Sequence, residues 1–151
     1  MKSLFTLLLS FLFLSCSQTT PIPKQLKEQN NNLPKKYMES LSFGEKELLV
    51  TTIDGKFYYI HKNGKKMQTI TYDDGPDKFS EGLARTKVNG KIGFFNRNLE
   101  ITLKPLYDFA FPFHNGIAEI CTGCREKEED GTMMLDGGTW KKIDRSGLII
   151  E

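Results

Sequence analysis

The chain carries the sequence DGKFYYIHKNG at residues 54–64 and, 35 positions later, NGKIGFFNRNL at residues 89–99. Each segment opens with an Asp-Gly or Asn-Gly pair, continues through aromatic and β-branched residues, and reaches a second turn-forming position nine residues after the first. Asp-Gly and Asn-Gly favour two-residue type I′ turns, because both central residues need a positive φ. The pattern therefore predicts two successive hairpins, which together form a three-stranded antiparallel meander.

The same period continues outside the hairpins. Tyr72-Asp73 and Tyr107-Asp108 are 35 positions apart, while Phe79 and Phe113 are 34 apart, and each Phe is followed three positions later by Gly-x-Ala. A single meander buries too little surface to be stable alone, so we expect the units to stack and bury Phe79 and Phe113 as plugs. The predicted fold is all-β, an array of antiparallel three-stranded meanders built from repeats of about 35 residues.

Two positions depart from the repeat. Leu99 stands where the first copy has Gly64, so its turn should place the positive φ on Asn98 or use another geometry. In the third copy, 14 extra residues separate Gly116 from Gly138, although the nine-residue turn spacing returns between Gly138 and Gly147. This insertion, at residues 123–137, lengthens one hairpin connection, and long excursions from a regular array often carry binding functions.

The N-terminus predicts export. Lys2 precedes an apolar segment, Leu4 to Leu14, that is too short for a membrane-spanning helix but suits the core of a secretory signal. Because this segment ends at Ser15-Cys16, residues 1–15 resemble a bacterial lipoprotein signal peptide, which implies lipidation of Cys16. Ser17 follows the cysteine, and this resemblance points to the outer membrane of the bacterial cell envelope.

Composition divides the rest of the chain. Residues 16–40 are polar and rich in proline and asparagine, without helical or strand periodicity, so we expect a flexible, lipid-anchored tether. Residues 41–151 form the predicted β-repeat domain, with sixteen Lys plus Arg against seventeen Asp plus Glu, a net charge of −1. A nucleic-acid partner is not expected, because such binders need an excess of basic residues on their surface.

The repeat resembles the WG-repeat family, whose unit reads approximately Pro-x-Tyr-Asp-x-Ala-x-x-Phe-x-x-Gly-x-Ala followed by Gly-Lys-Trp-Gly-Phe-Ile-Asp-x-x-Gly. Of the name-giving Trp-Gly pair, Ile92-Gly93 keeps the glycine, Trp140-Lys141 keeps the tryptophan, and Phe57-Tyr58 keeps neither. This resemblance covers about residues 47–151 and implies a β-rich interaction module with no catalytic residues and no cofactor. The best copy comprises Pro105, Tyr107, Asp108, Ala110, Phe113, Gly116 and Ala118.

Cys121 and Cys124 are the only thiols besides Cys16, and three interpretations apply to them. A disulfide that staples the base of the insertion is favoured in an oxidising periplasm. A thioredoxin-like redox pair would need a thiolate stabilised by a helix N-terminus or a cation. Zinc would need two further ligands, for which only His61 and His114 offer nitrogen, and their spacing is not that of a zinc site. No metal site is predicted.

The aromatic strand residues give the candidate ligand contacts. Burial between meanders is their default role, but any subset on an outer face would form a ledge for a peptide or glycan. The predicted function is therefore binding or scaffolding by a non-catalytic envelope lipoprotein with protein partners. The alternatives are a glycan or small-ligand receptor and a thiol-disulfide oxidoreductase that uses Cys121 and Cys124. The candidate ligand-binding residues are Tyr58, Tyr59, Phe94 and Trp140.

Overall fold

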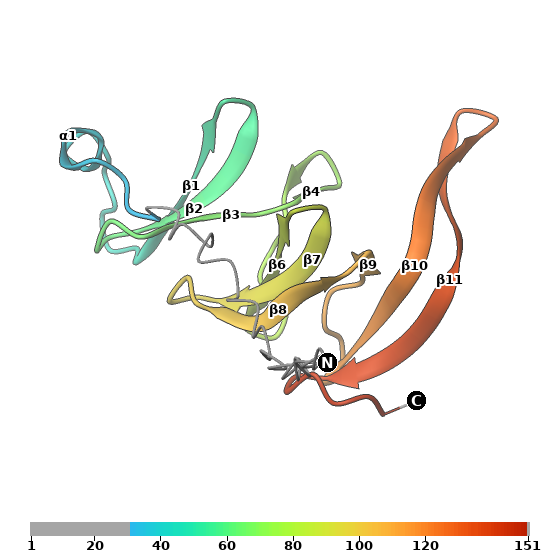
Figure 1. The fold of residues 1–151 in the computed structure, drawn as a ribbon. Helices are drawn as coiled ribbons and strands as arrows, with labels where there is room; N and C mark the ends of the chain where they lie inside the picture. Colours follow the sequence, from blue (N-terminus) through green and yellow to red (C-terminus); the bar gives the residue numbers. More distant parts are fainter. Residues whose placement is uncertain (1–30, 151) are drawn as a thin grey trace, which may run out of the picture.

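The computed structural model describes residues 31–150, which form three antiparallel sheets in succession along the chain, as Figure 1 shows. The first sheet has the order β1-β2-β3, the second β6-β7-β8, and the third β11-β10-β9. Their strands are β1 (Leu48–Ile53), β2 (Lys56–His61), β3 (Lys66–Gln68), β6 (Leu83–Val88), β7 (Lys91–Asn96), β8 (Ile101–Tyr107), β9 (Phe109–Ala110), β10 (Ile117–Glu129) and β11 (Thr132–Asp144). The connection between the first two sheets contains the short pair β4 (Thr71–Tyr72) and β5 (Gly75–Pro76). The predicted all-β array of meanders is confirmed.

Two classes of turn join the strands of each meander. Asp54-Gly55 and Asn89-Gly90 have positive φ at both positions, as a type I′ turn requires. At Asn63-Gly64 only the glycine has a positive φ, and His61 N–H donates to the Lys65 carbonyl. This turn is therefore a three-residue loop with a bulge, and the type I′ prediction for it was wrong.

Leu99 takes the glycine position of the equivalent loop in the second sheet. Its own φ is 58°, so the strain lies on Leu99 and not on Asn98. A left-handed conformation costs a residue with a Cβ roughly 1–2 kcal/mol. The Leu99 side chain is only 5% exposed and packs with Phe95 and Met67, and this burial offsets the strain.

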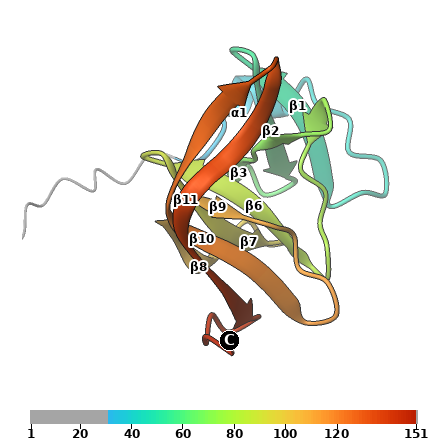
Figure 2. The same ribbon diagram turned by 90° about the vertical axis from the view of Figure 1, so that its right-hand side faces the viewer.

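The insertion is an extension of the third hairpin. Strands β10 and β11 have 13 residues each and pair from Ile117↔Asp144 to Glu129↔Thr132, and the hairpin turns at Asp130-Gly131. Both turn residues have positive φ, as in the shorter hairpins. Gly138, which the repeat spacing placed at a turn, instead lies within β11. We call residues 124–137 the arm; in Figure 2 the β10–β11 hairpin lies in front of the other sheets, with the arm at its upper end.

The core consists of two clusters, one on each face of the second sheet. One cluster joins Phe94 of β7 to Phe113 and Ile143 of the third unit, and the ring centroids of Phe94 and Phe113 are 4.9 Å apart. The other joins Phe95, the next residue of β7, to Tyr59 of the first sheet, with Phe79 packed against both. Both faces of the second sheet are thus covered, and the predicted roles of Phe79 and Phe113 as plugs are confirmed.

The N-terminal part of the described chain lies against the first sheet. Leu33 N–H donates to the Gly64 carbonyl, and Asn32 forms a β-bridge with Lys65 before the single turn of helix α1 (Lys35–Met38). The last ten residues of the expected tether, 31–40, therefore include a bridge and a hydrogen bond to the first sheet and one helical turn. The predicted signal peptide, Cys16 and the rest of the tether lie outside the described residues. Within residues 31–150, no helix has the length and apolar character to cross a bilayer.

Candidate functional site

The third sheet presents one face at the end of the array. In the second sheet, the corresponding face carries Leu83 and Ile92, which are 7% and 4% exposed because the third unit covers them. The repeat alignment places Ile117 at the position of Leu83 and Trp140 at that of Ile92. These residues are 38% and 42% exposed. We call this outward side of β10 and β11 the terminal face.

An open groove of about 690 Å³ lies on the terminal face. Three rings form one wall, with centroids 5.0 Å apart for Phe109 and Phe111 and 6.0 Å apart for each of these with Trp140. Phe111 and Trp140 are stacked, with their planes 29° apart. We call this hollow the aromatic groove. It is lined by Phe109, Phe111, Glu119, Glu126, Met133, Met134, Leu135 and Trp140.

The arm supplies a second wall of the aromatic groove. Met133 and Met134 are 61% and 52% exposed, and unbranched methionine side chains adapt their shape to a partner. Glu119 and Glu126 are the charged residues of the lining, and Lys142 lies opposite Glu119 in the strand register, on the same face. Exposed aromatic and methionine residues in one patch are typical of protein-interaction surfaces.

The neck of the arm is held by the two cysteines. The Cys121 and Cys124 sulfurs are 2.16 Å apart, a bonding distance, which agrees with the predicted disulfide. Cys121 is fully buried and Cys124 is 7% exposed. A Cβ at Gly138 would lie 2.6 Å from the Cys121 sulfur and 2.5 Å from the Cys124 nitrogen, so only glycine fits against the bridge.

Asp108 fixes the neck to the second unit. Its carboxylate binds the Lys91 ammonium and accepts a 2.6 Å hydrogen bond from Gly123 N–H. The hydrogen bond from Lys91, followed by that from Gly123, lowers the pKa of Asp108 below its ordinary value. Further along the arm, Glu126 lies 3.9 Å from the Lys87 ammonium. The second unit therefore contacts the third hairpin both at the neck and at Glu126 of the arm.

The structure separates the four predicted ligand residues. Phe94 is 1% exposed and Tyr59 is 8% exposed, so burial in the two core clusters removes both from the candidate surface. Burial also raises the pKa of Tyr59, whose hydroxyl donates to the Asp77 carbonyl at 2.8 Å. Trp140 lines the aromatic groove, and Tyr58 lines a different cleft between the first two sheets.

His61 has a structural role beside a turn. Its Nδ1 accepts a hydrogen bond from Asn63 N–H, just as Asn96 Oδ1 and Asp144 Oδ1 accept from the backbone of the equivalent turns. Hydrogen bonds from the Ser146 hydroxyl and from the backbone lower the pKa of Asp144. Within residues 31–150, no group of three or more His, Cys, Asp or Glu side chains is placed to hold a metal ion.

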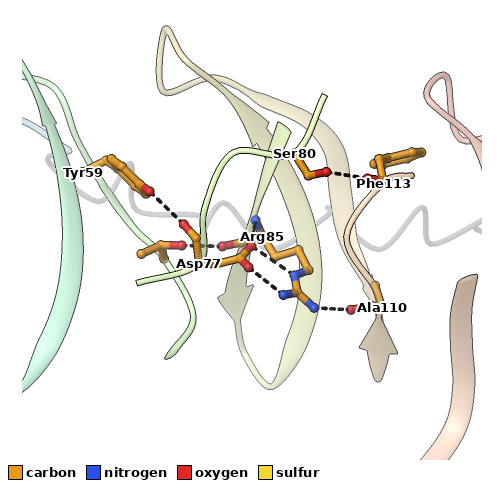
Figure 3. A network of polar contacts seen from close by, with 7 residues as sticks. Tyr59, Asp77, Ser80, Arg85, Ala110 and Phe113 are labelled. Carbon is orange, nitrogen blue, oxygen red and sulfur yellow. Dashed lines mark hydrogen bonds and ion pairs between the residues drawn. The ribbon is translucent and has the colours of Figure 1, made fainter. Parts of the chain in front are cut away.

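Sequence reasoning missed a buried ion pair that links all three units, as shown in Figure 3. Arg85 and Asp77 are 1% and 3% exposed, and two guanidinium nitrogens of Arg85 donate to the Asp77 carboxylate at 2.6 and 3.0 Å. A third donates to the Ala110 carbonyl at 2.7 Å in the next unit. On the other side, the Thr69 hydroxyl donates to the Arg85 carbonyl at 2.9 Å. The one hint in the sequence was a mismatch between copies: Arg85 aligns with Glu119 in the third copy, so this position does not follow the repeat.

Comparisons with known proteins agree with this architecture. Neither the curated proteins nor the solved structures gave a match to the chain. The family model described as "WG containing repeat" matches residues 59–91 and again residues 92–123. These matches span β2 to β7 and β7 to β10, and therefore include the stacked contact between the second and third units. The chain thus carries the WG-containing repeat in at least two consecutive copies.

Proposed function

We propose that this protein is a non-catalytic, lipid-anchored binding module of the bacterial cell envelope, and that it docks a polypeptide partner on the terminal face. The observation that carries the proposal is the aromatic groove. Two of its lining residues, Glu119 and Trp140, align with Arg85 and Ile92 of the second sheet, which are buried. The predicted export signal and Cys16 place the module at the membrane, where the tether would present it to other envelope proteins.

The repeat itself indicates what the partner should offer. In the second sheet, Arg85 reaches the next unit and donates to a backbone carbonyl there. The equivalent residue of the third sheet is Glu119, which can only accept hydrogen bonds when ionised. The partner should therefore present an apolar β-surface with a ring for the groove and a Lys or Arg facing Glu119 and Glu126.

The cysteine pair supports a structural role over an oxidoreductase. A catalytic thiol needs an accessible sulfur and a stabilised thiolate, whereas Cys121 is fully buried against Gly138. The bridge sits where the arm leaves the regular hairpin, so it braces the wall that carries Met133 and Met134. Mass spectrometry with and without reductant tests this role, because a structural bridge exchanges slowly and a catalytic pair rapidly.

Site-specific photo-crosslinking in the native envelope tests the docking proposal. A photoreactive residue at Met133 of the full chain should give a defined adduct, which Trp140→Lys and Glu119→Lys should each abolish. The matched control places the same probe at Val50, an exposed strand residue of the first sheet that is 45% exposed. Equal adducts from Met133 and Val50, or adducts that persist in both Lys variants, would refute docking at the terminal face.

A further inference from the structure

A second hollow, between the first and second sheets, has the opposite chemistry to the aromatic groove. It measures about 530 Å³, within the roughly 300–1,000 Å³ range of small-ligand sites. Residues of β2 and β3 line one side, and the end of β6 with the following turn lines the other. We call it the lysine cleft. It is lined by Asn31, Lys56, Tyr58, Lys66, Met67, Gln68, Thr86, Lys87, Val88, Asn89 and Ile101.

Three ammonium groups lie in the lysine cleft without a carboxylate among the lining residues. Lys56, Lys66 and Lys87 supply the positive charge. Of these, Lys87 has a carboxylate neighbour at 3.9 Å, Glu126, at the outer limit of an ion pair, and Lys66 lies over the Tyr58 ring at 5.9 Å from its centroid. Acidic and basic residues nearly balance over the whole domain, whereas the charged residues that line this cleft are all basic. The cleft therefore has a positive local potential, which attracts an anion.

The remaining lining residues suit a sugar. Asn31, Gln68 and Asn89 carry amides that both donate and accept hydrogen bonds, as the hydroxyls of a carbohydrate require. Tyr58 offers a hydroxyl, which lies 3.4 Å from Gln68 Oε1, beside the apolar body of its ring. Met67, Val88 and Ile101 add apolar surface for the C–H faces of a pyranose. Polar side chains around an apolar base are the usual composition of a small-ligand site.

The cleft continues far enough for more than one sugar ring. A neighbouring hollow of about 310 Å³ shares Lys56, Gln68 and Lys87 with the lysine cleft and extends it along β3 towards Tyr72. Its lining also includes Arg85, whose guanidinium is paired with Asp77 and lies 4.5 Å from the centroid of the Tyr72 ring, and one carboxylate, Glu126, which lies 3.9 Å from the Lys87 ammonium. An extended chain of linked sugars fits two adjoining hollows with shared cationic residues better than a single compact anion does.

From these observations we propose that the lysine cleft binds an anionic oligosaccharide, with its acidic groups on Lys56, Lys66 and Lys87 and one ring against Tyr58. The acidic groups are carboxylates or phosphates, which a lysine ammonium binds equally as a point charge. The lysine cleft itself shares no lining residue with the aromatic groove, whereas the neighbouring hollow shares Phe109 and Glu126 with it. Variants at Lys56, Lys66 and Tyr58 therefore test sugar binding separately from partner docking. A protein anchored in the envelope by one end would then also contact an envelope polysaccharide.

Calorimetric titration of the full chain in detergent tests the proposal with three matched probes. Trigalacturonate carries carboxylates, its methyl ester is a neutral analogue of the same shape, and glucose 6-phosphate represents the phosphate source. We expect trigalacturonate or glucose 6-phosphate to bind and the ester to bind at least tenfold more weakly. Whichever anionic probe binds identifies the acidic group, and a hexaglutamate peptide distinguishes a sugar from an acidic polypeptide.

Variants locate the binding. Lys56→Gln, Lys66→Gln and Lys87→Gln should each weaken binding of the anionic sugar roughly fivefold, as loss of one partly exposed charge contact does. Tyr58→Ala should weaken the sugar more than inorganic phosphate, because only the sugar has a ring to stack. Lys104→Gln is the matched control, since Lys104 is an exposed lysine of β8 outside the cleft. All variants replace surface groups, and unchanged circular dichroism confirms their fold.

Three results would overturn the proposal. The first is the absence of binding by both anionic sugars. The second is binding of hexaglutamate as tight as that of trigalacturonate, which would assign the cleft to an acidic peptide. The third is an equal loss in Lys104→Gln and in the cleft variants, which would mean a diffuse charge effect without a site.

Discussion

Replacing Arg85 with methionine should cost this protein a large share of its stability. The substitution keeps an unbranched side chain at a position that is 1% exposed but leaves the Asp77 carboxylate, 3% exposed, without its cation. The Ala110 carbonyl loses its donor in the same step, which weakens the contact between the second and third units. Asp77 retains one partner, the Arg85 backbone N–H, at 2.8 Å.

The size of the effect follows from the burial of the pair. Breaking a buried ion pair by removing one partner costs about 3–5 kcal/mol, because an uncompensated charge stays in the interior. Whole domains are stable by only about 5–15 kcal/mol. With a urea dependence of about 2 kcal/mol per molar, the unfolding midpoint should fall by about 1.5–2.5 M. This is enough to leave part of the population unfolded at physiological temperature.

A double variant separates charge burial from lost packing. Asp77→Asn with Arg85→Met removes both charges and keeps a carbonyl oxygen for the backbone N–H, so it should recover more than half of the loss. Lys62→Met is the control, since the Lys62–Glu47 pair has side chains that are 57% and 59% exposed, and exposed pairs contribute at most about 1 kcal/mol. Unfolding is followed by Trp140 fluorescence, because the chain has a single tryptophan, and by circular dichroism. An Arg85→Met midpoint within 0.5 M (roughly 1 kcal/mol) of the Lys62→Met midpoint would refute this reasoning.

Two further predictions concern the Asp144 turn and the packing of Gly93 in β7 against β8. The folded-state pKa of Asp144 is lowered, so its contribution to folding stability is present at neutral pH and lost as the pH falls below about 4. Asp144→Asn, which copies Asn96 of the second unit, should therefore reduce the change in the urea unfolding midpoint between pH 5 and pH 3. An unchanged pH dependence of the midpoint would contradict this. Gly93→Ala should destabilise by more than 2 kcal/mol in urea unfolding, because its Cβ would lie 2.6 Å from the Leu103 carbonyl oxygen and 2.7 Å from the Pro105 nitrogen. Gly75→Ala is the matched control, with no contact under 3.9 Å, and equal losses in the two variants would count against the steric explanation.

Local signals in the sequence predicted the parts of the fold that local physics determines. Asp54-Gly55 and Asn89-Gly90 specify their turns through φ alone, and Phe79 and Phe113 were recognisable because the repeat makes each a copy of the other. Sequence alternation could not decide which aromatic residues of the strands reach solvent. Both faces of the second sheet are covered by neighbouring units, so Phe94 and Phe95 are buried on opposite sides.

The candidate site was only half predictable for a different reason. The sequence drew attention to the insertion and to Trp140, but the nine-residue spacing at Gly138 concealed the Asp130-Gly131 turn that makes the insertion a hairpin. The long-range pair of Arg85 and Asp77 left no periodic trace, since neither residue recurs in the other copies. Phe109 and Phe111 join Trp140 only because β9 pairs with β10, a contact between segments that the repeat assigns to different parts of the unit.

The changes in the third copy share one location, and this argues for a specialised end of the array. Glu119 replaces Arg85, Lys142 replaces Phe94, and Trp140 replaces Ile92, all on the side by which one unit receives the next. A lysine at the position of Phe94 opposes the stacking of a further identical unit, because burial of its charged ammonium under that unit would cost desolvation free energy. The arm restores apolar surface beside that position through Met133 and Met134. We therefore expect the terminal face to exclude a further identical repeat, whereas the proposed partner would meet apolar side chains bordered by Glu119 and Lys142.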